Sequence, residues 1–358
     1  MTTRYSRREF GQVTLGSLPV AALLGRGGAA FAQQARPNSV WGGVPFGIFA
    51  PYRFGPEASD LEGALKALVN FGVSQTELSN AIVERYLGAP QPAGRGGGGG
   101  GAPAQPAANP PAAGAPPAAS APGAGRGRAV QTPEQQAAAR AAAEELTKWR
   151  TTIAIDRFKP VRSLFDAAGV TIYAYRLTLR ADMPDAEYDY TFNAAKALGA
   201  TQITMELPAD RALSQRIGDF AARHQVNVGY HLHTTATLTA WDEAMAQSPR
   251  NGLQLDIGHY VAGTGVSPVP LIEKHHARIF SMHLKDRKRA GHDQSENMPW
   301  GQGDTPIRDV LQLLKKQKWA IPVGIEFEYP VPAGSTWDAE IAKCVRYGRE
   351  ALLGTGSA

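Results

Sequence analysis

The sequence is poor in two features that stabilise or anchor many exported proteins. It contains one cysteine, Cys344, among 358 residues, so no intramolecular disulfide can form. Stability must therefore come from packing. It also lacks an apolar run of the roughly 20 residues that a membrane-spanning helix needs. The longest candidate, Val13 to Leu24, has about 12 residues, so we expect no membrane span once the N-terminal segment is removed.

The N-terminal segment has the pattern of an export signal. Arg7 and Arg8 precede the short apolar run, and an Ala-Phe-Ala tripeptide at 30–32 follows it. This order is typical of a twin-arginine signal peptide cleaved near Ala32; a frayed N-terminal helix is the alternative. We therefore predict a signal over residues 1–32 and a location in the periplasm. The twin-arginine route carries folded proteins, often with a cofactor inserted, which favours a metalloprotein.

The positive charge of the chain does not indicate a nucleic-acid partner. The formal net charge is +5, but the predicted signal holds four arginines and one acid, and residues 88–130 hold three arginines and no acid. Those two segments account for the whole surplus, so the rest of the chain is near neutral. A surface that follows a phosphate backbone is therefore not expected.

Residues 88–130 are almost entirely Gly, Pro, Ala and Ser. Such a composition offers too little apolar surface to form a packed core. We predict a disordered low-complexity insertion, and a tether to the cell wall or to a partner is the functional alternative.

Outside this insertion the chain repeats one unit, a short strand followed by an amphipathic helix. Helical spacing of apolar residues is clearest over 60–72, 189–199, 211–224 and 306–317. Eight strands are predicted, at 44–50, 73–79, 170–177, 201–207, 226–233, 252–258, 279–285 and 322–328. Eight such units over residues 37–353 predict an α/β fold, a single-domain (β/α)₈ TIM barrel. A doubly wound open sheet is the rival, but the glycine fingerprint of a dinucleotide-binding sheet is missing.

Alternation along the strands indicates which side chains point into the barrel. In TQITMEL the apolar residues Ile203, Met205 and Leu207 face the helices, so Glu206 faces the barrel axis. The same alternation predicts that several other polar residues point inward. All of them lie near the C-terminal ends of strands, where barrel enzymes build their active sites. These residues are His231, His233, Asp256, His283, Lys285, Glu326 and Glu328.

Carboxylates gathered this closely would repel one another unless a cation or protons lay between them. Glu206, Asp256, His283 and one of Glu326 and Glu328 could share a divalent metal ion. One nitrogen and three carboxylate ligands suit Mn²⁺, Mg²⁺ or Co²⁺ better than a thiolate-rich structural zinc site. Taken singly, the histidine could be a hydrogen-bonded core residue and each glutamate a partner for an arginine or a helix N-terminus.

At these residues the sequence resembles the sugar phosphate isomerase/epimerase superfamily. Its xylose isomerase-like barrels include tagatose 3-epimerase, inosose dehydratase and, more distantly, endonuclease IV. The resemblance runs from about Val44 to Leu353, with the insertion as a departure from the pattern. It is carried by the stretches TMELP, GYHLH, LDIGH, MHLKD, GQGD and IEFEYP, in this order.

The resemblance implies that Glu206, Asp256, His283 and Glu326 hold the metal. Glu326 is preferred over Glu328 as the ligand, because related barrels place the ligand first in a similar Glu-x-acid ending; the reverse assignment stays open. The residues that would line the substrate pocket are His231, His233, His259, Lys285 and Glu328. A structural role for each histidine, and a salt bridge from Lys285 to Asp256 or Glu328, are the alternatives.

Such a site suits removal of a proton next to a carbonyl group, with the metal stabilising the enediolate. Glu206 and Glu326 are the candidate base and acid, in either order. The expected substrate is a small carbohydrate, and the expected activity is that of a sugar isomerase or epimerase.

Two other functions stay open. A periplasmic enzyme would meet 3-keto-glycosides, which the same chemistry would cleave as a lyase or dehydratase. A catalytically inactive sugar-binding barrel is the alternative outside enzymes, although retained inward acids disfavour it. The endonuclease alternative is disfavoured by the near-neutral body, and the sequence leaves the oligomeric state open.

Overall fold

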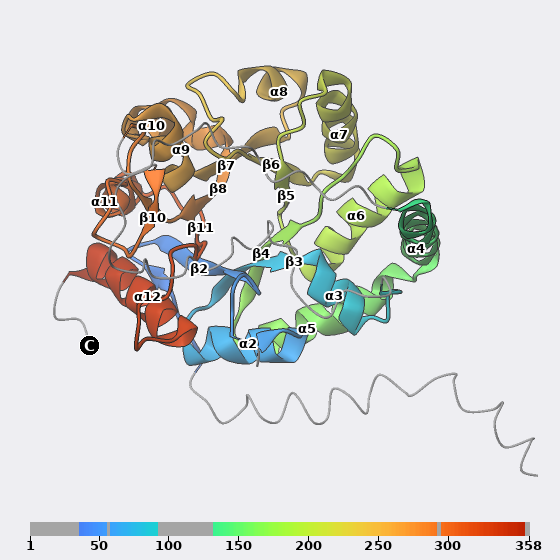
Figure 1. Ribbon diagram of the computed structural model, residues 1–358, viewed down its shortest axis with the longest axis horizontal. Coiled ribbons are helices and arrows are strands. Elements are labelled where there is room, and N and C mark those ends of the chain that lie inside the picture. The colour runs from blue at the N-terminus through green and yellow to red at the C-terminus, as the bar shows by residue number, and fades with distance from the viewer. Residues whose placement is uncertain (1–35, 56–57, 92–131, 292–294, 355–358) are drawn as a thin grey trace, which may run out of the picture.

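Eight parallel strands form a closed barrel in the computed structural model, which describes residues 36–55, 58–91, 132–291 and 295–354 (Figure 1). Each strand pairs with the next around the barrel, and β11 also pairs with β2. The fold is therefore the predicted (β/α)₈ barrel. The strands are β2 (Val44–Ala50), β3 (Gln75–Ser79), β4 (Thr171–Arg176), β5 (Gln202–Glu206), β6 (Asn227–His231), β7 (Asn251–Asp256), β8 (Ile279–Leu284) and β11 (Val323–Ile325).

Helices surround the strands, as the view along the barrel shows (Figure 1). They are α2 (Leu61–Asn70), α3 (Asn80–Tyr86), α4 (Pro133–Thr152), α5 (Lys159–Ala167), α6 (Asp185–Leu198), α7 (Arg211–His224), α8 (Asp242–Gln247), α9 (Ile257–Thr264), α10 (Val269–His275), α11 (Ile307–Gln317) and α12 (Trp337–Leu353). Short elements complete the chain: β1 (Val40–Trp41), 3₁₀ turns at Ile155–Phe158 and His276–Arg278, and the pair β9 (Asp286–Arg287) and β10 (Asn297–Met298). Among the residues described, no helix is long and apolar enough to cross a membrane.

Local signals explain where these helices begin and end. The side chain of Asp210 accepts a hydrogen bond from the backbone of Ala212 at 2.9 Å and so caps the start of α7. The helix ends at Gln225, which takes a left-handed conformation (φ 56°) and lets its N–H reach the last carbonyls. Strand β5, which precedes α7, packs its apolar face on the surrounding helices, with Ile203 and Met205 fully or almost fully buried.

The inside of the barrel is polar and tightly filled. The side chain of Gln202 donates to the carbonyl of Phe280 at 2.9 Å across the barrel. The phenol of Tyr173 lies so close to Gly324 that a Cβ there would approach its oxygen to 2.6 Å. Glycine allows this approach because it has no side chain, so the absence of a Cβ at Gly324 of β11 makes room for the ring of Tyr173 inside the barrel.

A buried ion-pair cluster joins helices on either side of the predicted insertion. Arg150 on α4 lies 2.9 Å from Glu84 on α3 and 2.8 Å from Glu187 on α6, and Tyr190 also donates to Glu84. The predicted signal (1–32) and nearly all of the predicted insertion (88–130) lie outside the described residues, so both stay predictions.

Candidate active site

Asp256 ends β7 and is buried, with 1% of its surface exposed. Its Oδ1 accepts a hydrogen bond from the backbone N–H of His259 at 2.7 Å, so the carboxylate caps α9. Its Oδ2 lies 3.1 Å from the Lys285 ammonium nitrogen but has no hydrogen-bond partner in the described part of the chain. The contact with Lys285 is therefore an ion pair without good hydrogen-bond geometry. Burial raises the pKa of Asp256 to about 7, against the lowering effect of Lys285.

Lys285 follows β8 and is 2% exposed. Its Nζ lies 2.7 Å from an oxygen of Glu326 and 2.7 Å from an oxygen of Glu328, in addition to its contact with Asp256. Burial opposes its charge, but the three carboxylates outweigh burial and raise the pKa of Lys285 above its usual value. The ion pair that the sequence analysis gave as an alternative role for Lys285 is thus present, with both Asp256 and Glu328 and with Glu326 as well.

His283 is held between two carboxylates inside the barrel. Its Nδ1 lies 2.9 Å from Glu326, and its Nε2 lies 2.6 Å from Glu77. Burial opposes protonation, but Glu326 and Glu77 together raise the pKa of His283 to about 10. For Glu326, burial opposes ionisation, but Lys285 and His283 outweigh it and hold the pKa of that carboxyl well below its usual value.

Glu77 is the main site residue that the sequence analysis missed. It is fully buried on β3, where it accepts hydrogen bonds from Thr204 and from Gln254, each at 2.6 Å. An ionised carboxylate only accepts hydrogen bonds, so Nε2 of His283, 2.6 Å from Glu77, carries a proton that points at it. Burial opposes ionisation of Glu77, but His283 and Arg176 outweigh it and lower its pKa. Glu77 therefore holds the proton on Nε2. Because the pKa of His283 is raised to about 10, Nδ1 is protonated as well at neutral pH, and a metal ion would have to displace that proton to bind His283 through Nδ1.

His231 gives the clearest indication that this site binds a ligand. It ends β6 with no exposed surface, and neither of its ring nitrogens has a hydrogen-bond partner among the residues described. Burial lowers its pKa well below the usual value, so the ring is neutral, the form that binds metal ions. Donor atoms of His231, Asp256, His283 and Glu326 all lie within 4.8 Å of one another. We call these four residues the buried quartet.

The quartet fits a divalent metal ion on this chemistry. Unpartnered nitrogen atoms are costly to bury, and a metal ion would satisfy one of the two of His231. Two imidazoles and two carboxylates form a donor set that transition-metal ions accept. The predicted ligands Asp256, His283 and Glu326 belong to this group, and His231, predicted to bind substrate, takes the fourth place.

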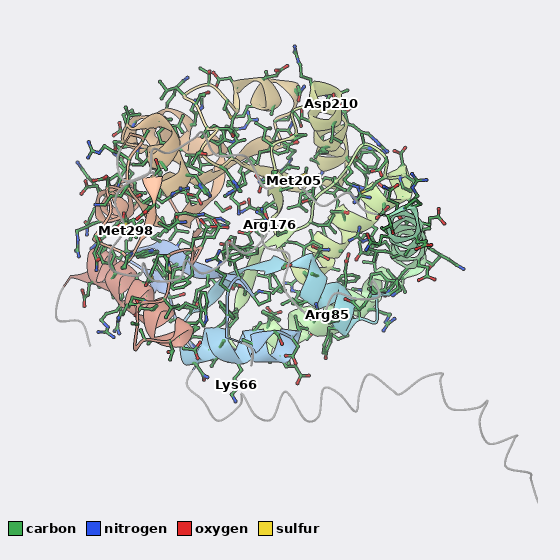
Figure 2. All side chains as sticks on the ribbon, viewed as in Figure 1. Lys66, Arg85, Arg176, Met205, Asp210 and Met298 are labelled. Carbon is green, nitrogen blue, oxygen red and sulfur yellow. The ribbon has the colours of Figure 1, made fainter. Side chains whose placement is uncertain are left out.

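Glu206 lies apart from the quartet, at the rim of the barrel. Its side chain is 45% exposed and accepts a hydrogen bond from Arg176 at 2.8 Å. Figure 2 shows Arg176 near the centre of the barrel. His233, 51% exposed, lies 3.6 Å from Glu206, and this contact raises the pKa of His233 above 6.5. Neither metal-binding group found in the described residues includes Glu206, so its role as a ligand stays a prediction.

The predicted substrate-binding histidines gather beside the quartet. Donor atoms of His231, His233 and His259 lie within 4.8 Å of one another, and the rings of His233 and His259 stack at 4.5 Å. Arg287, which the sequence analysis missed, lies 2.5 Å from Nδ1 of His259, and Lys285 lies 2.9 Å from its Nε2. Burial and the nearby cations lower the pKa of His259, so its ring is neutral.

All nine predicted site residues thus lie at the C-terminal ends of barrel strands or just beyond them. They form two layers, a buried one built from the quartet with Lys285 and a rim built from Glu206 and His233. Glu328 lies beside the buried layer, where it accepts from Lys285 at 2.7 Å and from the hydroxyl of Tyr52 at 2.8 Å. This arrangement can bind a cation below the rim and present a carboxylate and an imidazole to a molecule bound above it.

The sequence profile of the xylose isomerase-like TIM barrel family matches residues 156–347, more than half of the chain. The chain therefore belongs to this family, as the motifs predicted. Among curated proteins, none matches the sequence significantly.

Solved structures share the fold at low sequence identity. A xylose isomerase domain protein from Alicyclobacillus acidocaldarius is 14% identical with a TM-score of 0.54, over 86% of this chain and 97% of that one. A xylose isomerase domain protein from Planctomyces limnophilus is 14% identical with a TM-score of 0.52, over 86% and 98%. An uncharacterised protein from Parabacteroides distasonis is 19% identical with a TM-score of 0.51, over 85% and 98%. These similarities concern the fold, and the chemistry must be argued from the site.

Proposed function

We propose that the protein is an exported, divalent-metal-dependent enzyme that removes a proton next to the carbonyl group of a small carbohydrate, as a sugar isomerase or epimerase. The observation that carries this proposal is the buried quartet, in which both ring nitrogens of His231 lack a partner in the described structure. The quartet lies at the end of the barrel where enzymes of this fold act.

The quartet would hold the metal ion, and two nitrogen ligands favour Mn²⁺ or Co²⁺ over Mg²⁺. When bound, the ion supplies positive charge that stabilises the negative charge of an enediolate.

Glu206 is the base in this proposal. It is the acid of the site with the largest exposed surface, and Arg176 fixes its orientation. Glu326 is better suited to hold a cation than to donate a proton, because its lowered pKa keeps it ionised near neutral pH. His233 then returns the proton, because its raised pKa increases the protonated fraction at neutral pH.

A second candidate activity follows from the predicted export signal at Arg7 and Arg8. Outside the cytoplasm the enzyme would meet 3-keto-glycosides, in which the C2 proton is adjacent to the ketone. Glu206 would take that proton, the C1–oxygen bond would break with its electron pair leaving on the aglycone, and His233 would protonate the departing oxygen. The product would be an unsaturated 3-keto sugar, so this activity is a lyase.

The purified protein is incubated in D₂O with Mn²⁺, in parallel with a panel of ketohexoses and with a 3-keto-glucoside. The metal is then removed from the samples, and the products are analysed by NMR. Deuterium incorporation with a rearranged sugar and no released aglycone supports the isomerase or epimerase, and aglycone release supports the lyase. Turnover in either assay should disappear after treatment with a chelator.

The matched variant is Glu206→Gln, which keeps the size of the side chain but removes the base. It should lower the turnover rate by about 10²- to 10⁴-fold. Full activity in this variant would contradict the assignment of the base. Binding of sugars without any turnover would identify a sugar-binding barrel instead.

A further inference from the structure

We propose that Lys285 is an intrinsic counter-cation that competes with the divalent metal for Asp256 and Glu326. Metal binding then requires the ammonium group to leave these two acids while it keeps Glu328 and His259. This inference rests on the proposed function only for the metal, and it requires no particular substrate.

The position of the ammonium group is the first argument. Nζ of Lys285 lies 3.1 Å from Asp256 and 2.7 Å from Glu326, so it contacts both acids of the quartet. The Glu326 oxygen involved is Oε2, the same atom that lies 2.9 Å from Nδ1 of His283. The lysine charge thus lies against the donor atoms that a metal ion would use.

The second argument is that both cations cannot share these atoms. A transition-metal ion binds carboxylate oxygen at roughly 2.0–2.2 Å. An ion at that distance from Oε2 of Glu326 would face the Lys285 ammonium a few ångströms away, in a site shielded from water. Repulsion between charges of the same sign is strong in such surroundings, so one of the two cations must move.

The third argument is that Lys285 has a second set of partners already in contact. Its Nζ donates to Glu328 at 2.7 Å and lies 2.9 Å from Nε2 of His259, and neither residue belongs to the quartet. Tyr52 fixes Glu328 from the other side, through a hydrogen bond of 2.8 Å. A rotation of the terminal bonds of Lys285 would keep these contacts and release Asp256 and Glu326. The two glutamates therefore divide their roles, with Glu326 as metal ligand and Glu328 as lysine partner.

Gly258 supports this division, because it leaves room for the lysine side chain. A Cβ at Gly258 would approach Cγ of Lys285 to 2.3 Å. The start of α9 is thus shaped around the stem of Lys285, which keeps the ammonium group within reach of both sets of acids.

The experiment compares the wild-type protein with Lys285→Met after chelation. Mn²⁺ affinity is measured by calorimetry, and thermal unfolding is followed with and without Mn²⁺. We expect Lys285→Met to bind Mn²⁺ at least about tenfold more tightly, because a buried positive charge beside the site is removed. We also expect the chelated variant to unfold at a lower temperature than the chelated wild type, and Mn²⁺ to restore most of the loss. The control is Lys66→Met, on the outer face of α2 (Figure 2), which should leave both quantities unchanged.

Equal or weaker Mn²⁺ binding by Lys285→Met would overturn the proposal, and so would a lack of binding by both proteins. If the variant does not fold, NMR of ¹⁵N-lysine-labelled wild-type protein gives a second test with diamagnetic Zn²⁺. The buried ammonium resonance of Lys285 should shift in step with Zn²⁺ binding, whereas binding without such a shift would refute the exchange. None of these measurements uses a sugar, so failure of the proposed function and failure of this inference are distinguishable.

Discussion

Glu77→Gln is the substitution that best tests the inner layer of the site. Glu77 lies beneath the quartet and accepts from Nε2 of His283 at 2.6 Å. Glutamine keeps the shape and one acceptor oxygen but removes the charge that holds the proton on Nε2. Loss of such an outer partner of a metal-binding histidine typically weakens metal affinity by about 10–100-fold. We expect a loss of Mn²⁺ affinity in this range.

The same substitution should also destabilise the fold. Glu77 is fully buried and accepts three hydrogen bonds of 2.6 Å, from Thr204, Gln254 and His283. Removing one partner of a buried charge pair costs about 3–5 kcal/mol, and the smaller value applies because Glu326 still faces the imidazole. A loss of ~3 kcal/mol would lower the unfolding temperature by roughly 5–10 °C. Urea unfolding and thermal scans of the chelated protein measure this change, and calorimetry measures the affinity.

The matched control is Thr204→Val, which removes a donor to the other oxygen of Glu77 without touching His283. It should cost ~1–2 kcal/mol of stability and leave Mn²⁺ affinity nearly unchanged. The reasoning would be refuted if Glu77→Gln bound Mn²⁺ as tightly as the wild type, or if Thr204→Val weakened binding equally.

Three further predictions concern other parts of the molecule. Arg150→Met should destabilise the protein by ~3–5 kcal/mol in urea, because it leaves buried acids unpaired, whereas exposed Arg140→Met on the same helix should change stability by less than ~0.5 kcal/mol. Gly258→Ala should cost ~1–3 kcal/mol by crowding Lys285, and unchanged stability and Mn²⁺ affinity would contradict the packing described. Turnover should fall as pH rises through the raised pKa of His233, because its protonated form is the donor; a pH profile of His233→Asn that kept this limb would exclude the assignment.

The order of strands and the direction of most inward side chains could be predicted from the sequence. Alternation in TQITMEL identified the buried face of Ile203 and Met205, and eight strands of this kind leave few folds other than a barrel. Several boundaries differ: β11 ends at Ile325 rather than at residue 328, β6 ends at His231 rather than at residue 233, and β7 ends at Asp256 rather than at residue 258. The carboxylate of Asp256 caps α9, so the helix begins directly after the strand, which alternation alone does not indicate.

The site was predicted less completely, for reasons that concern side-chain pairing. Glu77 lies in a strand of mostly polar residues, QTELS, and the register with β4 shifts between Thr76 and Glu77. A bulge of this kind changes where a side chain points, so counting residues could not place Glu77. The orientation of Glu206 toward Arg176 and the three ion pairs of Lys285 depend on neighbours far apart in sequence. The sequence signal that could have found Glu77 is an acidic residue in the middle of a predicted barrel strand.

The ion pair between Glu84 and Arg150 also bears on how this barrel can change over evolutionary time. The two residues stand before and after the Gly/Pro/Ala-rich segment, and their contact is made inside the protein. Because the free-energy cost of closing a loop grows only slowly with its length, chain inserted between two such anchored points disturbs the barrel little. This junction is therefore a place where lineages can lengthen, shorten or replace a segment without changing the rest of the barrel. It is equally a place where an engineer could graft a second domain.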